Sequence, residues 1–402
     1  MAKKTAVLML ILFVASLLAG CWNRKELNEL GIAVAAGVDM EEGGRYRLTV
    51  QVVDPGQVAA QKGASGGAPA TLYTSEGDTI FEAARRITQI SPRKIYFSHL
   101  RLFLIGESLA RRGIGQMLDL LSRDHEFRTD FYLVVTRGTS ALETLKIMTP
   151  LEPVPANKLF SSLETSEDNW SPSLSVTLDE LIDDLTSQGK HPVLTGLMIT
   201  GDPQKGQTKK NIANIYTPTQ LQYSGMAVFK KDKLIGWLDE KESRGYHQIH
   251  GGVKSSVVFI PCPEGGKVAV EYIRGKTNVK GKVVQGQPRI DIQVEIEGNI
   301  GAIGCKNLDI TDTATIAGLE KKVEARIIDF IEQTIDKAQT EYKVDIFGFG
   351  EAIRRADPKA WKTMKKNWDE EYFTHLPVDT RADFIIRRIG TITDSFLKQA
   401  KE

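Results

Sequence analysis

Two hydrophobic periods alternate along the first half of the chain. Short apolar runs of strand length are separated by segments whose apolar residues recur at the spacing of one helix face. Alternating strands and helices are typical of α/β layering. The pattern predicts strands over residues 31–40, 45–52, 100–105, 130–136 and 192–200, and helices after a cap at Asp78 and over 107–123, 139–148 and 178–185.

The second half of the chain shows a clearer period of two. Residues 290–297 alternate strictly between isoleucine or valine and polar side chains, which is typical of a strand with one buried face. Apolar residues at four-residue steps from Leu319 to Ile335 predict one long helix that covers a sheet. Further strands are predicted over 222–229, 233–238, 268–273, 289–297 and 378–386. Strands, a long helix and a final strand indicate an α+β unit.

The chain begins with a predicted secretory signal peptide over residues 1–20. Lysines precede an apolar run that is too short to span a bilayer, and polar residues follow at once. The run ends with small residues before a cysteine, similar to the lipobox of bacterial lipoproteins: Leu18, Ala19, Gly20 and Cys21. An ordinary cleaved signal and an uncleaved anchor helix are the alternatives, and charge, length and small residues together favour lipidation.

Cys21 is therefore the predicted lipid acceptor. We expect it to carry diacylglycerol, with or without an additional N-acyl chain such as palmitate. One acyl chain holds a protein only weakly at a membrane, whereas two or more hold it stably.

Beyond the signal peptide, the predicted fold class is α+β or mixed α/β, in a multi-domain lipoprotein ectodomain with β-sheets covered by helices. Removing residues 1–20 leaves 402 − 20 = 382 residues, which is too long for a single core. We predict an N-terminal α/β region over 21–200, a polar, glycine-containing linker over 201–216 and a C-terminal α+β domain over 217–398. Residues 54–71, rich in Gly, Ala, Ser and Gln, are predicted to form a loop.

Composition and charge narrow the possible partners. The formal net charge is +1 at pH 7, so no overall basic field would attract nucleic acid. Besides Cys21, the chain contains only Cys262 and Cys305. Export permits a disulfide between them, but the sequence favours the interpretation that both are unpaired, small apolar side chains.

Three short motifs are candidates for chemistry, and each lacks the context that its chemistry needs. Residues 63–67 match G-x-S-x-G but lie in the predicted loop, not between a strand and a helix. His247 and His250 could form a metal pair, but no third ligand stands at a fitting spacing. Residues 348–350 lack the third glycine of a dinucleotide fingerprint. We therefore expect no enzymatic activity, no catalytic residue, no cofactor and no metal.

Several segments match those of a known family in the same order along the chain. They are residues 20–30, residues 123–128 ahead of Gly138, the hairpin of residues 225–238 with Glu242, Arg244 and Gly245 behind it, and Asp345, residues 347–350, Pro358, Trp361 and Trp368. With these segments the sequence resembles the Ger(x)C family, the lipoprotein C subunits of bacterial spore germinant receptors. The resemblance covers essentially the whole mature chain.

The resemblance implies a lipid-anchored protein on the outer face of the spore inner membrane. Such a protein would assemble with a transmembrane A subunit and a transmembrane B subunit and would be required for nutrient-triggered germination. The C-terminal domain would be GerAC-like. The motif match gives no ligand site, and Phe229, Trp237 and Arg244 are candidates for a partner surface.

The alternative function is a solute-binding lipoprotein that delivers a small molecule to a transporter. Such proteins hold their ligand in a cleft between two similar lobes, so a cleft of several hundred Å³ would favour this alternative. The dissimilar patterns of the two halves argue against it.

Overall fold

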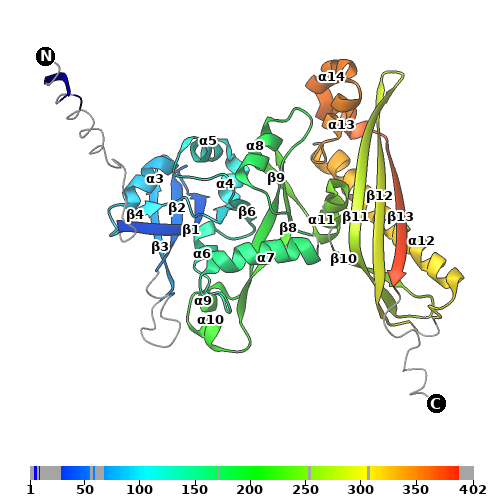
Figure 1. Ribbon diagram of the computed structural model, residues 1–402, viewed down its shortest axis with the longest axis horizontal. Helices are drawn as coiled ribbons and strands as arrows, with labels where there is room; N and C mark the ends of the chain where they lie inside the picture. The colour runs from blue at the N-terminus through cyan, green and yellow to red at the C-terminus, as the bar shows by residue number, and fades with distance from the viewer. Residues whose placement is uncertain are drawn as a thin grey trace.

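The computed structural model contains two β-sheets with helices packed against them (Figure 1). It describes residues 4–6, 9, 29–54, 58, 68–170, 172–251, 255–305 and 308–388. The predicted mixed α+β fold class is confirmed. The lipobox residues, including Cys21, lie outside the described residues, so the lipid anchor stays a prediction.

The larger sheet has nine strands and a parallel centre. Its strands are β1 (Leu30–Met40), β2 (Tyr46–Val53), β3 (Ala70–Gly77), β4 (Lys94–Tyr96), β5 (Leu102–Ile105), β6 (Tyr132–Thr136), β7 (Val193–Gly201), β8 (Thr219–Lys230) and β9 (Lys233–Leu238). The strands β1, β5, β6 and β7 are parallel, and antiparallel pairs extend the sheet on both sides, in the order β3-β2-β1-β5-β6-β7-β8-β9. β1 is apolar along most of its length because both faces of the sheet are covered.

Helices cover both faces of the larger sheet. One face is covered by α3 (Ile80–Ile87), α4 (Glu107–Arg112), α5 (Gly115–Arg123) and α8 (Leu178–Thr186), and the other by α6 (Ala141–Leu145) and α7 (Pro155–Asn169). The break between α4 and α5 falls at Gly113, where the sequence predicts it. The predicted cap at Asp78 is wrong by one residue, because the hydroxyl of Thr79 accepts the Glu82 N–H at 3.1 Å.

The predicted linker over residues 201–216 does not separate two sheets. It contains two short helices, α9 (Pro203–Gly206) and α10 (Lys210–Ala213), and it connects β7 to its antiparallel neighbour β8. The larger sheet therefore continues past the predicted domain boundary as far as Leu238. This polar, glycine-containing segment is a helix-containing connection between two paired strands of the larger sheet.

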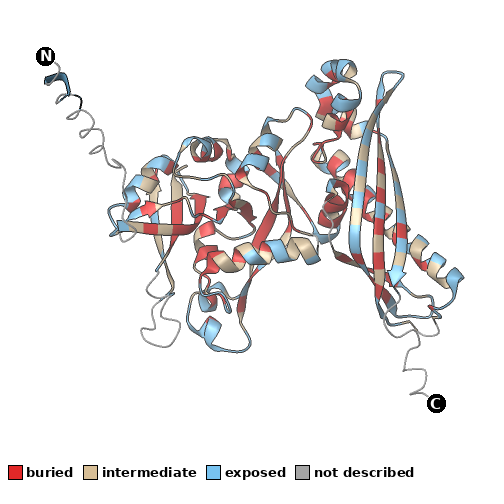
Figure 2. Ribbon diagram, viewed as in Figure 1, coloured by how far each residue is buried: buried red, intermediate tan, exposed pale blue. Residues whose placement is uncertain are grey.

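The smaller sheet has four strands and one buried face. Its strands are β10 (Ser256–Pro261), β11 (Lys267–Val284), β12 (Gln287–Ile303) and β13 (Val378–Arg388), paired in that order. Burial alternates along β12, as the sequence predicts, because only one face meets helices (Figure 2). β13 runs parallel to β12. The strand order makes β10 and β13 the two edges of this sheet.

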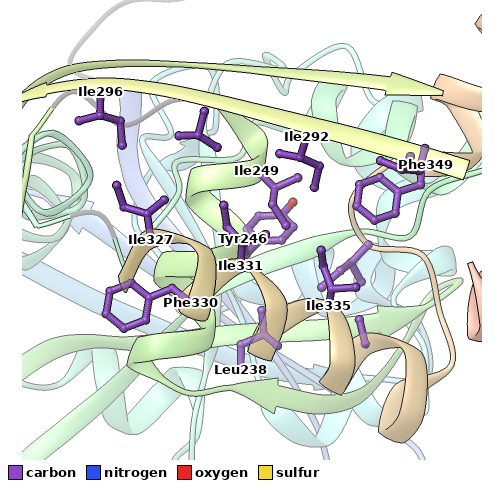
Figure 3. Packing of buried hydrophobic residues seen from close by; sticks show 14 of the residues in the cluster. Leu238, Tyr246, Ile249, Ile292, Ile296, Ile327, Phe330, Ile331, Ile335 and Phe349 are labelled. Carbon is purple, nitrogen blue, oxygen red and sulfur yellow. The ribbon is translucent and has the colours of Figure 1, made fainter. Parts of the chain in front are cut away.

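The long helix α12 (Thr313–Lys337) lies against the buried face of the smaller sheet. Its predicted stripe from Leu319 to Ile335 is confirmed as buried. The same core takes in α11 (Glu240–His250), α13 (Phe349–Ala356) and α14 (Pro358–Met364). It also includes Val193, Met226, Val228 and Leu238 from the larger sheet, so the two sheets share one core (Figure 3).

Cys262 and Cys305 form a disulfide, with their Cα atoms 5.8 Å apart. The interpretation that favoured two unpaired cysteines is therefore wrong. The bond joins the residue after β10 to the chain just beyond β12, across the intervening strand β11. The edge strand β10 is thereby tied covalently to the body of the sheet.

Candidate functional site

The helix α11 occupies the junction between the two sheets. Its first turn is fixed by reciprocal capping, in which Asp239 accepts the Glu242 N–H at 2.9 Å and Glu242 accepts the Asp239 N–H at 2.7 Å. Polar side chains of α11, Ser243, His247 and Gln248 among them, are buried in the junction. Gly245 lets α11 cross α12 closely, since a Cβ there would collide with the Phe330 carbonyl oxygen.

Arg244 connects three elements at this junction. Its Nη1 atom donates to the Val257 carbonyl oxygen of β10 at 2.9 Å, and its Nη2 atom donates to Glu240 at 3.2 Å. The guanidinium lies 4.2 Å from the ring centroid of Trp170, the residue that ends α7. The side chain of Arg244 is nearly buried, so its main role is to hold α7, α11 and β10 together.

A groove of about 800 Å³ opens beside Arg244, along the free edge of β10. Phe259 stands in it with 47% of its surface exposed, and Lys267 and α12 form its other walls. Among the described strands, β10 pairs with β11 alone and so forms one edge of the smaller sheet, although the Val257 carbonyl oxygen is already bound by Arg244. An unpaired strand edge of this kind is a template for the backbone of another chain.

The groove carries an excess of positive charge. Arg244 is paired with Glu240, and Arg326 with Asp329 at 2.7 Å. The exposed amines that remain, none with an ion pair among the described residues, are Lys241, Lys267 and Lys322. Five cations against two anions leave an excess of 5 − 2 = +3 around the groove.

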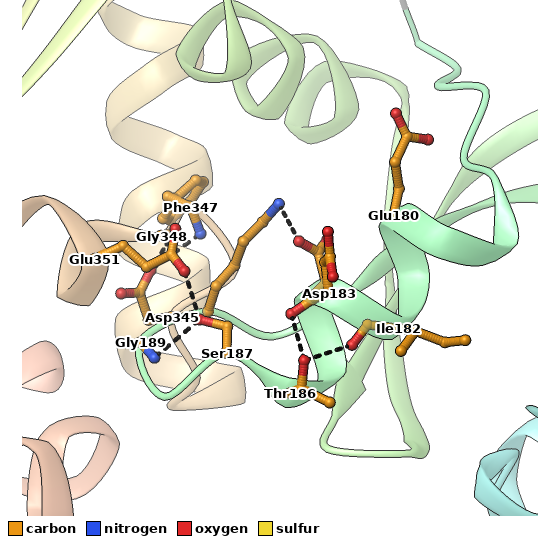
Figure 4. A network of polar contacts seen from close by, with 12 residues as sticks. Glu180, Ile182, Asp183, Thr186, Ser187, Gly189, Asp345, Phe347, Gly348 and Glu351 are labelled. Carbon is orange, nitrogen blue, oxygen red and sulfur yellow. Dashed lines mark hydrogen bonds and ion pairs between the residues drawn. The ribbon is translucent and has the colours of Figure 1, made fainter. Parts of the chain in front are cut away.

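A second polar cluster closes the junction on the side of α8 (Figure 4). Ser187, just after α8, donates to Glu351 of α13 at 2.8 Å, and Lys190 pairs with Asp184 at 2.6 Å. Gly189 lies against Gly350, where a Cβ would come within 2.7 Å of backbone atoms. These contacts fix α8 of the larger sheet to α13 of the C-terminal region.

Asp345 organises the turn that leads into α13. Its carboxylate accepts N–H groups from the turn at 2.7–3.2 Å and the indole N–H of Trp368 at 2.9 Å. Burial raises the pKa of Asp345 to about 6, although these hydrogen bonds act in the opposite direction. The backbone N–H groups of Gly348 and Gly350 are thus part of this turn.

His191 links the same turn to the hairpin of β8 and β9. Its backbone N–H donates to the Asp345 carbonyl oxygen at 2.7 Å, and its Nε2 lies 2.8 Å from Asp369. Its Nδ1 accepts the Lys231 N–H at 3.0 Å, so Nε2 carries the proton and donates to Asp369. Burial of Asp369 opposes ionisation, but the hydrogen bond from His191 holds the pKa of Asp369 below its usual value.

The three residues proposed as a partner surface have different positions. Phe229, on β8, is completely buried in the core on one face of the larger sheet, so its assignment to a surface is wrong. Trp237 is partly buried, with the guanidinium of Arg137 4.9 Å from its ring and its Nε1 3.4 Å from Glu107. Only Arg244 lines the groove. The exposed residues that sequence reasoning missed are the lysines and Phe259.

The two histidines of the possible metal pair on α11 differ in exposure. His247 is buried in the junction, whereas His250 is exposed and its ring stacks on Tyr246 at a centroid distance of 5.9 Å. In the part of the chain that the structure describes, no group of three or more His, Cys, Asp or Glu side chains could hold a metal ion.

Comparison with known proteins identifies the family. Residues 23–199 match the family model described as the spore germination protein N-terminal domain, and residues 224–390 match the one described as spore germination B3/GerAC like, C-terminal. Spore germination protein KC of Bacillus subtilis (strain 168) is 32% identical, with all of both chains covered. The chain belongs to the Ger(x)C family.

Other relatives extend the Ger(x)C match in sequence and in fold. Spore germination protein B3 of Bacillus subtilis (strain 168) is 27% identical, covering 97% of this chain and 99% of that protein. The crystal structure of the GerBC protein matches with a TM-score of 0.54 and 21% identity, covering 91% of this chain and all of that one, and so shows the same fold. Among the described residues, no helix has the length and apolar content needed to cross a bilayer.

Proposed function

We propose that the chain is the lipid-anchored C subunit of a spore germinant receptor. In this role it assembles with transmembrane A and B subunits on the outer face of the spore inner membrane and is required for nutrient-triggered germination. The observation that carries the proposal is the end-to-end likeness to spore germination protein KC. The lipobox at Cys21 supplies the anchor.

The groove beside β10 is the surface that we assign to receptor assembly. Its excess of three positive charges suits an acidic segment, and the free edge of β10 suits an extended backbone. Phe259 offers an apolar contact in the middle of this edge. An extended acidic segment of the A or B subunit would add a strand to the smaller sheet.

Charge reversal in the groove tests this assignment in spores that lack the native chain. Lys241→Glu combined with Lys322→Glu should reduce crosslinking to the A and B subunits and slow germination through this receptor. The matched control is Lys321→Glu with Lys359→Glu, since these lysines are exposed but do not line the groove. Normal crosslinking in the groove variant, or equal loss in the control, would contradict the assignment.

The anchor is tested separately by Cys21→Ala. This variant should remain unprocessed and should lose stable membrane attachment and germination through this receptor. Normal germination by a fully soluble form would show that the anchor is dispensable.

The groove also bears on the alternative function of solute capture. Its volume is in the range of ligand sites. However, all its lining residues except Trp170 lie between residues 240 and 330, and the two sheets differ in strand order and direction. It therefore lies along one sheet edge and not between two similar lobes, which favours a protein partner.

A further inference from the structure

Four large exposed apolar side chains lie on two segments that are hydrogen-bonded to each other next to the larger sheet. Leu151 is 101% exposed, Ile215 107%, Tyr216 81% and Ile212 41%. We call these four residues the apolar tip. They come from the segment after α6, from α10 and from the connection between α10 and β8; Figure 1 shows α10 at the lower edge of the N-terminal half. Grouped exposed apolar residues are typical of surfaces that bind a membrane or another molecule.

The base of the apolar tip is held by a buried asparagine. Asn211 donates from Nδ2 to the carbonyl oxygens of Met148, at 2.8 Å, and Thr219, at 3.0 Å. Its Oδ1 accepts the Thr219 N–H at 3.0 Å, and the Met148 N–H donates to the Gly206 carbonyl oxygen at 2.9 Å. The two segments are thus pinned side by side, so their apolar side chains are presented outward.

Positive charge accompanies the apolar tip. Lys205, Lys209 and Lys210 are exposed on α9 and α10 and the turn between them, and Asp202 is the single acidic residue of the segment. The segment from 202 to 216 therefore carries 3 − 1 = +2, and the exposed Glu152 beside Leu151 reduces the excess around the apolar tip to 2 − 1 = +1. Aliphatic and tyrosine side chains beside lysines are the composition of surfaces that settle into the interface of anionic bilayers.

We propose that the apolar tip inserts into the interfacial layer of a membrane that contains anionic phospholipid. The inference rests on the proposed lipid anchor for its geometry. Eight residue steps from Cys21 to Glu29 span at most about 28 Å, and β1 and the tip belong to the same half of the molecule (Figure 1). The anchor supplies the affinity, and the tip sets the orientation of the chain on the membrane.

A lipid surface suits the apolar tip better than a protein partner. The tip projects fully exposed side chains with lysines around them, and such a surface needs no complementary pocket in a fluid interface. Anionic headgroups also match its local charge. The groove beside β10 differs from the apolar tip, because it is concave and runs along a strand edge.

A fluorescent label at position 215 tests insertion directly. Cys262 and Cys305 are joined to each other, and Cys21 is acylated in the mature chain, so Ile215→Cys introduces the single reactive thiol. An environment-sensitive dye there should shift to the blue on phosphatidylcholine vesicles containing phosphatidylglycerol, and spin-labelled lipid should quench it. The matched control is Ile90→Cys, at an exposed site of the same half (56% exposed).

Two further preparations separate the tip from the anchor. Lys209→Glu with Lys210→Glu, in the labelled chain, should lose most of the blue shift on anionic vesicles. Replacing Cys21 by serine and holding the N-terminus on nickel-chelating lipid tests the tip even if acylation fails. Failure of the native chain to float with vesicles would count against the anchor alone. Equal spectra at positions 215 and 90 on tethered chain would overturn the insertion, as would a shift that requires the A and B subunits instead of lipid.

Discussion

Asp345 is a residue whose importance comes from the fold around it. Its carboxylate meets the N–H groups of the turn before α13 and the indole of Trp368, which lies 23 residues further along the chain. The groups that hydrogen-bond to the carboxylate are N–H donors of the turn and of the Trp368 indole. The sequence places Asp345 in a family motif, but the chain must fold back from Trp368 before the reason for an acidic residue is visible.

We predict that Asp345→Asn lowers the free energy of unfolding by about 1–3 kcal/mol at neutral pH. The side-chain NH2 group of asparagine cannot accept, so buried N–H groups of the turn lose an acceptor. The pKa of Asp345 is raised from 3.8 to about 6 in the folded chain. The folded state therefore binds the proton more tightly than the unfolded state, and stability from this group falls as pH rises from about 4 to about 6. Urea unfolding of both chains across this range should show the advantage of the native residue growing as pH falls. A constant difference would contradict the raised pKa.

Among the elements, α11 is one that sequence periodicity did not reveal. The hairpin of β8 and β9, the alternation of β12 and the stripe of α12 were predictable because each buries an apolar face. The helix α11 buries Ser243, Arg244 and His247, so its sequence shows no apolar stripe. β3 was missed for a related reason, since its residues are mostly half-exposed and polar.

We predict that Gly245→Ala destabilises the chain by about 1–3 kcal/mol, since overpacking at a close helix crossing forces backbone shifts. The added Cβ would meet the Phe330 carbonyl oxygen and the Thr334 hydroxyl of α12. Gly318→Ala is the control, because that helical position has open space around it. The control should be neutral or stabilising by up to about 1 kcal/mol. Chemical denaturation measures both changes, and equal effects would show that α11 and α12 are not closely packed.

The disulfide between Cys262 and Cys305 joins the edge strand β10 covalently to the rest of the smaller sheet. Replacing both Cys262 and Cys305 by serine should cost about 2–4 kcal/mol, because a bridge between residues 43 apart limits the unfolded chain. Reductant should lower the melting temperature of the native chain but not that of the double variant. If reductant has no effect on the native chain, the two cysteines are not joined in solution.

At the scale of the whole molecule, the two halves are joined more closely than their sequence patterns indicate. Family models match on either side of residues 200–223, close to the predicted linker. The larger sheet nevertheless continues through β8 and β9, and side chains of both sheets enter one core. The sequence shows a change of hydrophobic period here, but local periodicity does not encode which strands pair, so it could not show that strand pairing crosses this point.

The last prediction separates a receptor subunit from a solute carrier. A germinant that bound the isolated residues 22–402 would stabilise their folded state by mass action, by about 2.7 kcal/mol at a hundred times its dissociation constant. Each kcal/mol shifts the midpoint by roughly 2–4 °C for domains of 150 to 250 residues. We expect no shift with amino acids, sugars or nucleosides at millimolar concentration. The groove combines basic side chains with a strand edge, which suits an extended acidic peptide. The Lys241→Glu, Lys322→Glu variant serves as the control, since a solute held in the groove would lose its effect there. A reproducible shift with one solute, competed by its close analogue and absent in this variant, would establish the groove as a solute site.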